Sequence, residues 1–176
     1  MALSTTITEL ETRRLRLQWL DAGDADLLLA IWNDPAFVRY VGDRGIRTKE
    51  QALLAFEEGP ATLYRDYGFG PFRVSLRDGG DAIGICGLFR RTGLEDVDIG
   101  YALLPQFCGR GYAEEAARAV VGHAKDDLGL RRLTAIISPD NKRSIGLVEK
   151  LGLRFEKMIR MPDDDEDVCL YGVSWQ

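Results

Sequence analysis

The sequence predicts a single α+β domain over residues 1–176, and three observations support this prediction. The chain has 176 residues, enough to bury one hydrophobic core without disulfides or metal. Several short segments alternate apolar and polar residues at period two, whereas others repeat apolar residues at helical spacing. No internal repeat, low-complexity stretch or linker divides the chain, so we expect one domain.

The first elements are predicted to be a strand and a helix. Charged or polar side chains alternate with large apolar ones over residues 13–19, which indicates a half-buried strand. Asp21 or Asp24 is a suitable cap for a helix that continues to Trp32. We expect this helix to stop before Pro35, because proline disfavours helical backbone in the residue that precedes it.

A second helix and then an antiparallel meander are expected next. Thr48 and Gln51 have the spacing of a capping box, and Gly59 with Pro60 marks the end of the helix that they begin. Short apolar segments joined by tight turns follow. The expected strands of the meander are 72–76, 82–89 and 97–104.

The last part of the chain is predicted to begin with a long helix after a glycine-rich segment. The small apolar residues at positions 113, 116, 117, 120, 121 and 124 lie on one helical face. Because nearly all of them are Ala or Val, this helix can pack very close to a sheet. The remaining expected elements are a strand at 132–137, a helix from Asp140 to Leu151, and strands at 153–158 and 168–175.

Composition excludes several classes of function. The 28 acidic and 23 basic residues are mixed along the chain and give a net charge of −5, so we expect no nucleic-acid partner. A single histidine, His123, disfavours multi-histidine metal sites, and we expect no metal. The longest apolar run, residues 27–32, is too short to span a membrane. Cys86, Cys108 and Cys169 are widely spaced, as in reduced cytoplasmic proteins, so we expect a cytoplasmic location.

The most informative segment is residues 106–113, between a predicted strand and a predicted helix. A helix N-terminus presents unpaired N–H groups and a partial positive charge, and flanking glycines let an anion approach closely. The segment therefore predicts a phosphate cradle. It lacks the Lys-Ser or Lys-Thr of a Walker loop, and it has Glu114 where a dinucleotide fingerprint needs a small residue.

Four motifs occur in order along nearly the whole chain. They are Trp-Asn-Asp-Pro at 32–35, Ile-Gly-Tyr at 99–101, Gly-Arg-Gly-Tyr-Ala at 109–113, and Asn141-x-x-Ser144 followed by Glu-Lys-Leu-Gly at 149–152. With these motifs the sequence resembles the GCN5-related N-acetyltransferases (GNAT), and more narrowly the ribosomal-protein N-terminal acetyltransferase-like (RimJ/RimL-type) subgroup. The resemblance implies a mixed, mostly antiparallel sheet of about seven strands flanked by four main helices.

The resemblance also implies acetyl-coenzyme A as a co-substrate. In the family, backbone N–H groups of the cradle bind the pyrophosphate, and the preceding strand pairs its backbone with the pantetheine arm. The cofactor-binding positions implied here are Ala102, Leu103, Leu104, Gln106, Gly109, Arg110, Gly111, Tyr112, Ala113, Asn141 and Ser144.

Two residues are candidates for catalysis. Asp98 precedes the Ile-Gly-Tyr motif where related sequences often carry an acidic residue, so it is the first candidate base. An exposed strand carboxylate paired with a neighbouring arginine is an equal alternative for Asp98. Water is an equal candidate for the base. Ser144 is the candidate that protonates or orients the leaving thiol, because Val148 stands where many family members have a tyrosine.

The function that these expectations imply is transfer of an acetyl group to a primary amine, either a protein N-terminal α-amine or a small molecule. The alternative is a regulatory or degenerate member that binds acetyl-coenzyme A without an acceptor. A nucleotide-dependent enzyme is a third class. The acidic run 163–167 is expected at a solvated hairpin tip, where it would attract a cationic amine if it overhangs the acceptor site. Relatives occur as monomers and homodimers.

Overall fold

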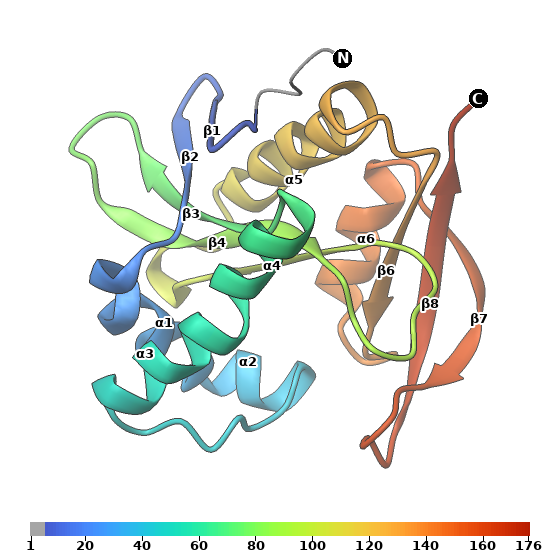
Figure 1. The fold of residues 1–176 in the computed structure, drawn as a ribbon. Helices are drawn as coiled ribbons and strands as arrows, with labels where there is room; N and C mark the ends of the chain where they lie inside the picture. Colours follow the sequence, from blue (N-terminus) through green and yellow to red (C-terminus); the bar gives the residue numbers. More distant parts are fainter. Residues whose placement is uncertain (1–5) are drawn as a thin grey trace.

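The computed structural model describes residues 6–176, which form one eight-stranded sheet with helices on both faces (Figure 1). The strands lie in the order β1-β2-β3-β4-β5-β6-β8-β7. Every neighbouring pair is antiparallel except β5 and β6, which are parallel. The strands are β1 (Glu9–Glu11), β2 (Leu15–Trp19), β3 (Pro71–Leu76), β4 (Ala82–Phe89), β5 (Asp98–Leu103), β6 (Arg132–Ile137), β7 (Arg154–Arg160) and β8 (Asp167–Ser174).

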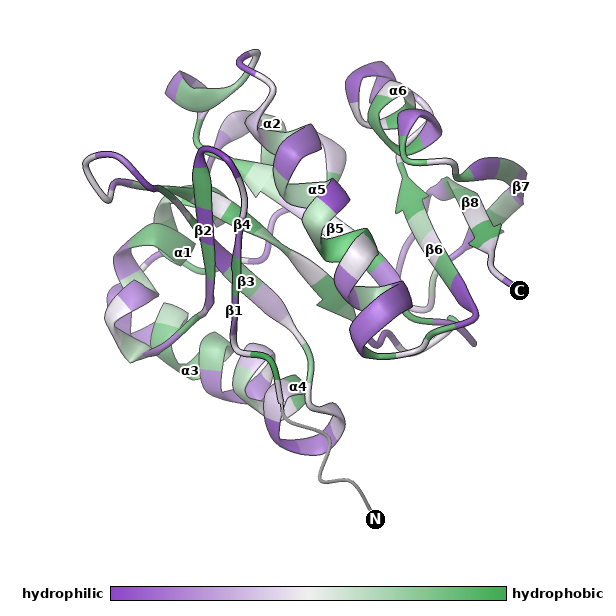
Figure 2. Cartoon of the chain, turned by 90° about the horizontal axis from the view of Figure 1, so that it is seen from above, coloured by the Kyte–Doolittle hydropathy of each residue, from purple (hydrophilic) through white to green (hydrophobic). Residues whose placement is uncertain are grey.

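Helices cover the sheet on both sides. The α-helices are α1 (Ala25–Trp32), α2 (Pro35–Tyr40), α3 (Lys49–Glu58), α4 (Pro60–Tyr67), α5 (Tyr112–Gly122) and α6 (Lys142–Lys150). Figure 2 shows α5 lying across the sheet, over strands that it contacts directly, β2, β4 and β5. The helix α6 packs against β6 on the same side, whereas α1 contacts β4 from the other face.

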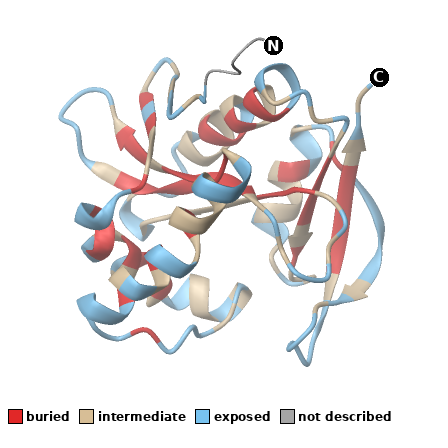
Figure 3. Ribbon diagram, in the orientation of Figure 1, coloured by how far each residue is buried: buried red, intermediate tan, exposed pale blue. Residues whose placement is uncertain are grey.

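Two hydrophobic clusters hold these layers together, and Figure 3 shows buried residues concentrated in the central strands and on the sheet-facing side of α5. The larger cluster lies between the sheet and α5, where Ala116, Ala117 and Val120 are completely buried. These small side chains allow the close approach that their spacing predicted. The second cluster joins α1 and α3 to the opposite face through Trp32 and Ile85.

The predicted α+β fold is confirmed, with three short elements that the sequence reading did not anticipate. The edge strand β1 was missed because it has only three residues. The helices α2 and α4 lie outside the expected elements, because Pro35 and Pro60 each indicate the end of the preceding helix. Each proline also occupies the first turn of a new helix, where its absent N–H group leaves no intrahelical bond unmade. The carboxylate of Asp34 caps α2 by accepting from two backbone N–H groups.

No helix in the described part of the chain is both long and apolar enough to cross a membrane.

Candidate active site

A cavity of about 470 Å³ opens between the end of β5, the start of α5, the first turns of α6, and the helix α2. Its lining contains seven of the residues proposed from sequence to bind the cofactor. These are Ala102, Leu103, Gly109, Gly111, Ala113, Asn141 and Ser144. Segments far apart in the sequence therefore converge on one cavity. The side chains of Leu104, Gln106, Arg110 and Tyr112 lie outside its lining.

One wall of the cavity exists because two parallel strands separate. Among the described residues, β5 and β6 pair at a single position, Asp98 with Thr134. Beyond this pair β5 continues to Leu103 with β4 alone as its partner. The backbone of β5 that would face β6 is therefore free to pair with an extended, amide-containing ligand. Tyr101, Ala102 and Leu103 of this segment line the cavity.

The glycine-rich segment forms a second wall. Gly109 and Gly111 have φ values of 77° and 81°, a left-handed conformation that residues with a side chain rarely adopt. Gly111 occupies the N-cap position of α5, and no side chain accepts from the first N–H groups of this helix. These donors and the helix dipole favour an anion at this end of the cavity.

Arg14, in the turn between β1 and β2, holds the glycine-rich segment in place. Its Nη1 donates to the carbonyl oxygen of Arg110 at 3.0 Å, and its guanidinium lies over the ring of Tyr112, 4.5 Å from the centroid. Its Nε forms an ion pair of 2.6 Å with Glu115. The backbone carbonyl of Arg110 and the ring of Tyr112 thus connect the cradle to Arg14. Sequence reasoning missed Arg14, because no local signal connects this turn with a helix about a hundred residues later.

The start of α6 supplies the third wall. The Oδ1 atom of Asn141 accepts from the backbone N–H of Ser144 at 3.3 Å and caps the helix. Tyr101 reaches across from β5, and its hydroxyl donates to the carbonyl oxygen of Ser144 at 3.2 Å. Burial raises the pKa of Tyr101 to about 12, so its hydroxyl stays protonated at neutral pH. Sequence reasoning gave Tyr101 little weight, whereas the structure places it in the cavity beside Ser144.

A cation that sequence reasoning also missed lies next to the cradle. A Cβ atom added to Gly109 would lie 3.8 Å from Nη2 of Arg143, and Arg143 lines the cavity. The side chain is exposed, and it forms no ion pair with any of residues 6–176. A basic residue in the first turn after the Asn141 cap was the available sequence signal.

Asp98 occupies a different position from the other candidates. Its side chain is 1% exposed, and both of its carboxylate oxygens accept from Nε of Arg91, at 2.9 and 3.1 Å. Burial raises the pKa of Asp98, although the charge and hydrogen bond of Arg91 oppose the shift. The residue lies where β5 and β6 begin to separate, but it is not part of the cavity lining.

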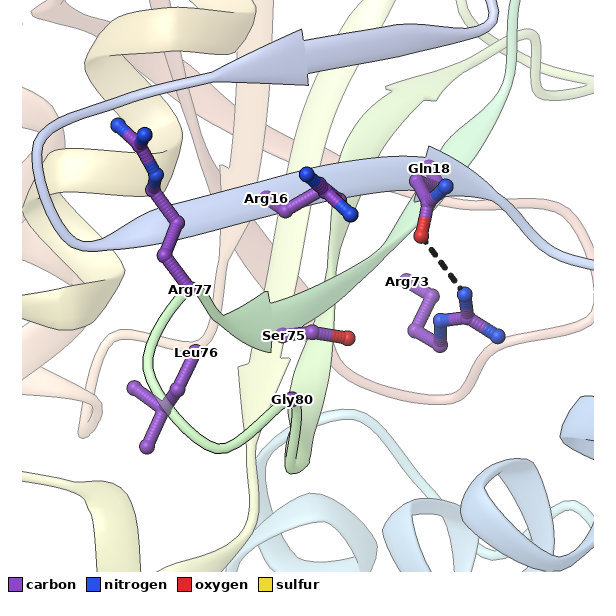
Figure 4. A pocket seen from close by; sticks show the side chains of 7 residues that line it. All are labelled: Arg16, Gln18, Arg73, Ser75, Leu76, Arg77 and Gly80. Atoms are coloured by element: carbon purple, nitrogen blue, oxygen red, sulfur yellow. Dashed lines mark hydrogen bonds between the residues drawn. The ribbon is translucent and has the colours of Figure 1, made fainter.

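A second, smaller pocket of about 150 Å³ lies on the outer strands β2 and β3 (Figure 4). Its arginines already have partners within the chain. Arg73 donates to Gln18 at 2.8 Å and to Asp24 at 3.0 Å, Arg16 pairs with Glu11, and Arg77 donates to a backbone carbonyl. These contacts indicate that the arginines stabilise the sheet.

The remaining reactive side chains are dispersed. Residues 6–176 contain no group of three His, Cys, Asp or Glu side chains arranged to hold a metal ion. His123 is buried at the end of α5, where its Nδ1 lies 2.8 Å from Asp127. Cys86 and Cys169 are buried, whereas Cys108 is exposed at the rim of the cavity.

Comparison with known proteins identifies the family. The acetyltransferase (GNAT) domain matches residues 14–154. An uncharacterized protein of Bacillus subtilis, YkkB, is 31% identical over 87% of this chain and 89% of its own length. The uncharacterized N-acetyltransferase YoaA of the same species is 30% identical over 86% of this chain and 85% of its own length.

Solved structures share the fold over almost the whole chain. An acetyltransferase from Agrobacterium tumefaciens superposes with a TM-score of 0.81 at 25% identity, and the match covers 99% of both chains. Mycobacterium smegmatis RimJ, determined in complex with a coenzyme A disulfide, superposes with a TM-score of 0.79 at 17% identity, covering 97% of this chain and 88% of RimJ.

The sheet is mixed, its two parallel strands separate, and a cavity lies between the end of β5 and the glycine-rich start of α5. Together these features define the acyltransferase class of protein. The chain belongs to the GNAT acetyltransferase family. It is an acetyl-coenzyme A-dependent acetyltransferase, as the resemblance implied.

Proposed function

We propose that the protein transfers the acetyl group of acetyl-coenzyme A directly to a primary amine, either a protein N-terminal α-amine or a small molecule. The observation that carries this proposal is the single cavity that joins an anion-binding helix start to the free edge of β5. The coenzyme A bound to the structural neighbour RimJ supports the same donor. A cytoplasmic location and a monomeric or homodimeric state remain predictions.

The proposal places each part of acetyl-coenzyme A against a matching surface. The backbone N–H groups of residues 109–113 would bind the pyrophosphate, with the guanidinium of Arg143 beside them. The free edge of β5 at residues 102–104 would pair with the amides of the pantetheine arm. Asn141 uses its Oδ1 to cap α6, which leaves its amide N–H groups for the cofactor.

Catalysis would rest mainly on positioning and on stabilising the oxyanion of the tetrahedral intermediate. The amine nitrogen forms a bond to the thioester carbon, the carbon–sulfur bond breaks, and the amine loses a proton. Backbone N–H groups of β5 would stabilise the oxyanion. We propose Asp98, acting through a water, as the acceptor of the amine proton. The raised pKa of Asp98 suits this role, because it moves the carboxylate toward the pKa of an α-amine.

Replacement of Ser144 tests the proposed proton donor. We expect Ser144→Ala to lower kcat between about tenfold and a hundredfold, less than the full effect of a general acid, because a thiolate is already a fair leaving group near neutral pH. The dissociation constant of acetyl-coenzyme A should stay unchanged, since Asn141 still caps α6. Steady-state kinetics with calorimetry check both. An unchanged kcat would contradict the role, and a fall for Tyr101→Phe alone would assign the proton to Tyr101.

Replacement of Cys108 tests whether the acetyl group passes directly to the amine or first forms an acetyl-enzyme on the Cys108 thiol. The thiol is exposed at the cavity rim, and its contacts are the carbonyl oxygens of Leu103 and Leu104. Among residues 6–176 no basic side chain lies within hydrogen-bond distance to activate it. We expect Cys108→Ser to keep kcat within about twofold, and initial velocities to show a ternary complex. Ping-pong kinetics, together with an acetylated Cys108 detected by mass spectrometry, would overturn direct transfer.

A further inference from the structure

A pair of arginines lies on the face of β5 that is turned away from α5. Arg91, in the loop after β4, binds Asp98 through Nε alone. Its Nη2 lies 3.6 Å from the position that a Cβ atom at Gly100 would take. The guanidinium of Arg91 therefore lies beside β5 at Gly100, next to the ring of Phe89 over which it packs. Asp98, Gly100 and Ala102 alternate onto one face of this strand, and Ala102 lines the cavity.

Arg44 is the second member of this pair. Its guanidinium lies over the ring of Trp32, 4.4 Å from the centroid, and Trp32 packs in the same cluster as Ala102. Partial burial and the charge of Arg91 lower the pKa of Arg44, so each guanidinium experiences the other's positive charge. Two like charges held near each other without a shared counter-ion are destabilising unless an anion joins them.

The carboxylates near this pair are already engaged or exposed elsewhere. Among the described residues Arg44 forms no ion pair, and the Nη atoms of Arg91 form no hydrogen bond. Asp43 pairs with Arg47 at 2.6 Å, and Asp96 pairs with Arg132 at 2.8 Å. The site therefore keeps a net positive charge of at least one, even with Asp98 ionised.

The acidic hairpin tip lies on the same side of the molecule. A Cβ atom at Gly93, in the loop that carries Arg91, would meet Pro162 at 2.4 Å, so this loop touches the turn between β7 and β8. The exposed carboxylates of residues 163–166 follow that turn. Negative charge at the hairpin tip and positive charge beside β5 together favour a ligand that carries both an ammonium and an anionic group.

We infer that the acceptor is a small amino acid-like amine whose carboxylate is bound by the guanidinium groups of Arg44 and Arg91 while its amino group reaches the thioester. This inference rests on the proposed function and narrows its acceptor. A guanidinium fork matches the two oxygens of a carboxylate, and the Nη atoms of Arg91 are free for this contact. An internal peptide bond replaces this carboxylate at a protein N-terminus, so such an acceptor lacks the group that the arginines recognise.

The experiment compares amino acids with their own amides as acceptors. Alanine, β-alanine and glutamate are each assayed beside the corresponding α- or C-terminal amide, and a neutral peptide is included. The amino group of an amide loses its proton more readily, so chemistry alone favours the amide. We expect at least one acid to exceed its amide in kcat/KM by about tenfold to a hundredfold, the effect of a charged hydrogen bond. Binding to the complex with coenzyme A is measured in parallel by calorimetry.

Variants of the arginines connect the preference with its cause. Arg44→Gln should remove most of the preference for the acid by raising its KM, with the affinity for acetyl-coenzyme A unchanged. Because Arg91→Gln would leave the buried Asp98 unpaired, Arg91→Lys is used, which keeps the charge but loses the fork. Arg65→Gln, an exposed residue of α4 that pairs with Asp66, is the matched control.

The outcomes separate this inference from the proposed function. Acetylation of amides or the neutral peptide at least as well as the acids, or binding of no acid to the coenzyme A complex, overturns the inference while acetyl transfer stands. A preference that survives Arg44→Gln and Arg91→Lys together also overturns it. Loss of coenzyme A binding by the unmodified protein would instead refute the proposed site itself.

Discussion

Gly111→Glu should weaken binding of coenzyme A at least about a hundredfold, because several charge-assisted hydrogen bonds to the pyrophosphate are lost together. Gly111 has a φ of 81° and forms the N-cap of α5. A Cβ atom there would lie 3.2 Å from Nη2 of Arg14, so the new carboxylate is drawn to the arginine that supports the cradle. It would place negative charge where the phosphates must lie. Calorimetric titration with coenzyme A measures the loss.

Gly122→Glu is the matched control for this change. It adds the same side chain near the far end of α5, where the new Cβ would have no described atom within 4 Å apart from its chain neighbours and the backbone of its own helix. We expect its affinity for coenzyme A to remain within about twofold, with circular dichroism unchanged for both variants. Full affinity in Gly111→Glu would refute the placement of the pyrophosphate at the glycine-rich segment.

Asp98→Asn should lower kcat by about a hundredfold or more if its carboxylate accepts the amine proton. Burial raises the pKa of Asp98 above its usual value of 3.8. The base is active only when unprotonated, so the rate of the unmodified enzyme should rise with pH across this raised pKa. The fall in kcat at low pH, the acid limb of the profile, should therefore occur at a higher pH than an exposed carboxylate would give. The residual kcat of Asp98→Asn should not show this fall. A pH profile of kcat measures both.

The pH profile also separates a base from a structural carboxylate. Asp98 holds Arg91, so its replacement disturbs a buried ion pair even if no proton is transferred. A structural role would lower kcat or stability but leave the acid limb in place. Asp96→Asn, two residues earlier in a half-exposed pair with Arg132, should retain both rate and profile. Retention of the limb in Asp98→Asn would transfer the role of base to water.

Local sequence signals predicted most of the secondary structure, because the interactions involved are short in range. Thr48 and Gln51 form the capping box that their spacing indicated, and Asp21 caps the turn that leads into α1. Proline was ambiguous because its missing N–H and its ring end one helix, whereas its fixed φ suits the first turn of another. Pro35 and Pro60 act in this second way.

The parts of the site that are formed by adjacent residues of one segment were predictable from the sequence. Glycines before a helix predict an anion-binding backbone, and Gly109 and Gly111 have the left-handed conformation that this requires. The contact of Arg14 with the cradle was not predictable, since it depends on which distant segments become neighbours, whereas the pairing of Asp98 with a nearby arginine was one of the two expectations for that residue. The separation of β5 from β6 is likewise a property of the whole sheet, although it opens the cavity in which those glycines act.

Release of the coenzyme A thiol in the presence of a panel of amines tests the central claim most directly. The panel contains amino acids, their amides, polyamines and short peptides, each with acetyl-coenzyme A and the unmodified protein. The account predicts thiol release that depends on an amine, matched mole for mole by acetylated amine, and its loss in Gly111→Glu. Coenzyme A binding without amine-dependent release from any member of the panel would contradict it and indicate a binding protein that has no acceptor.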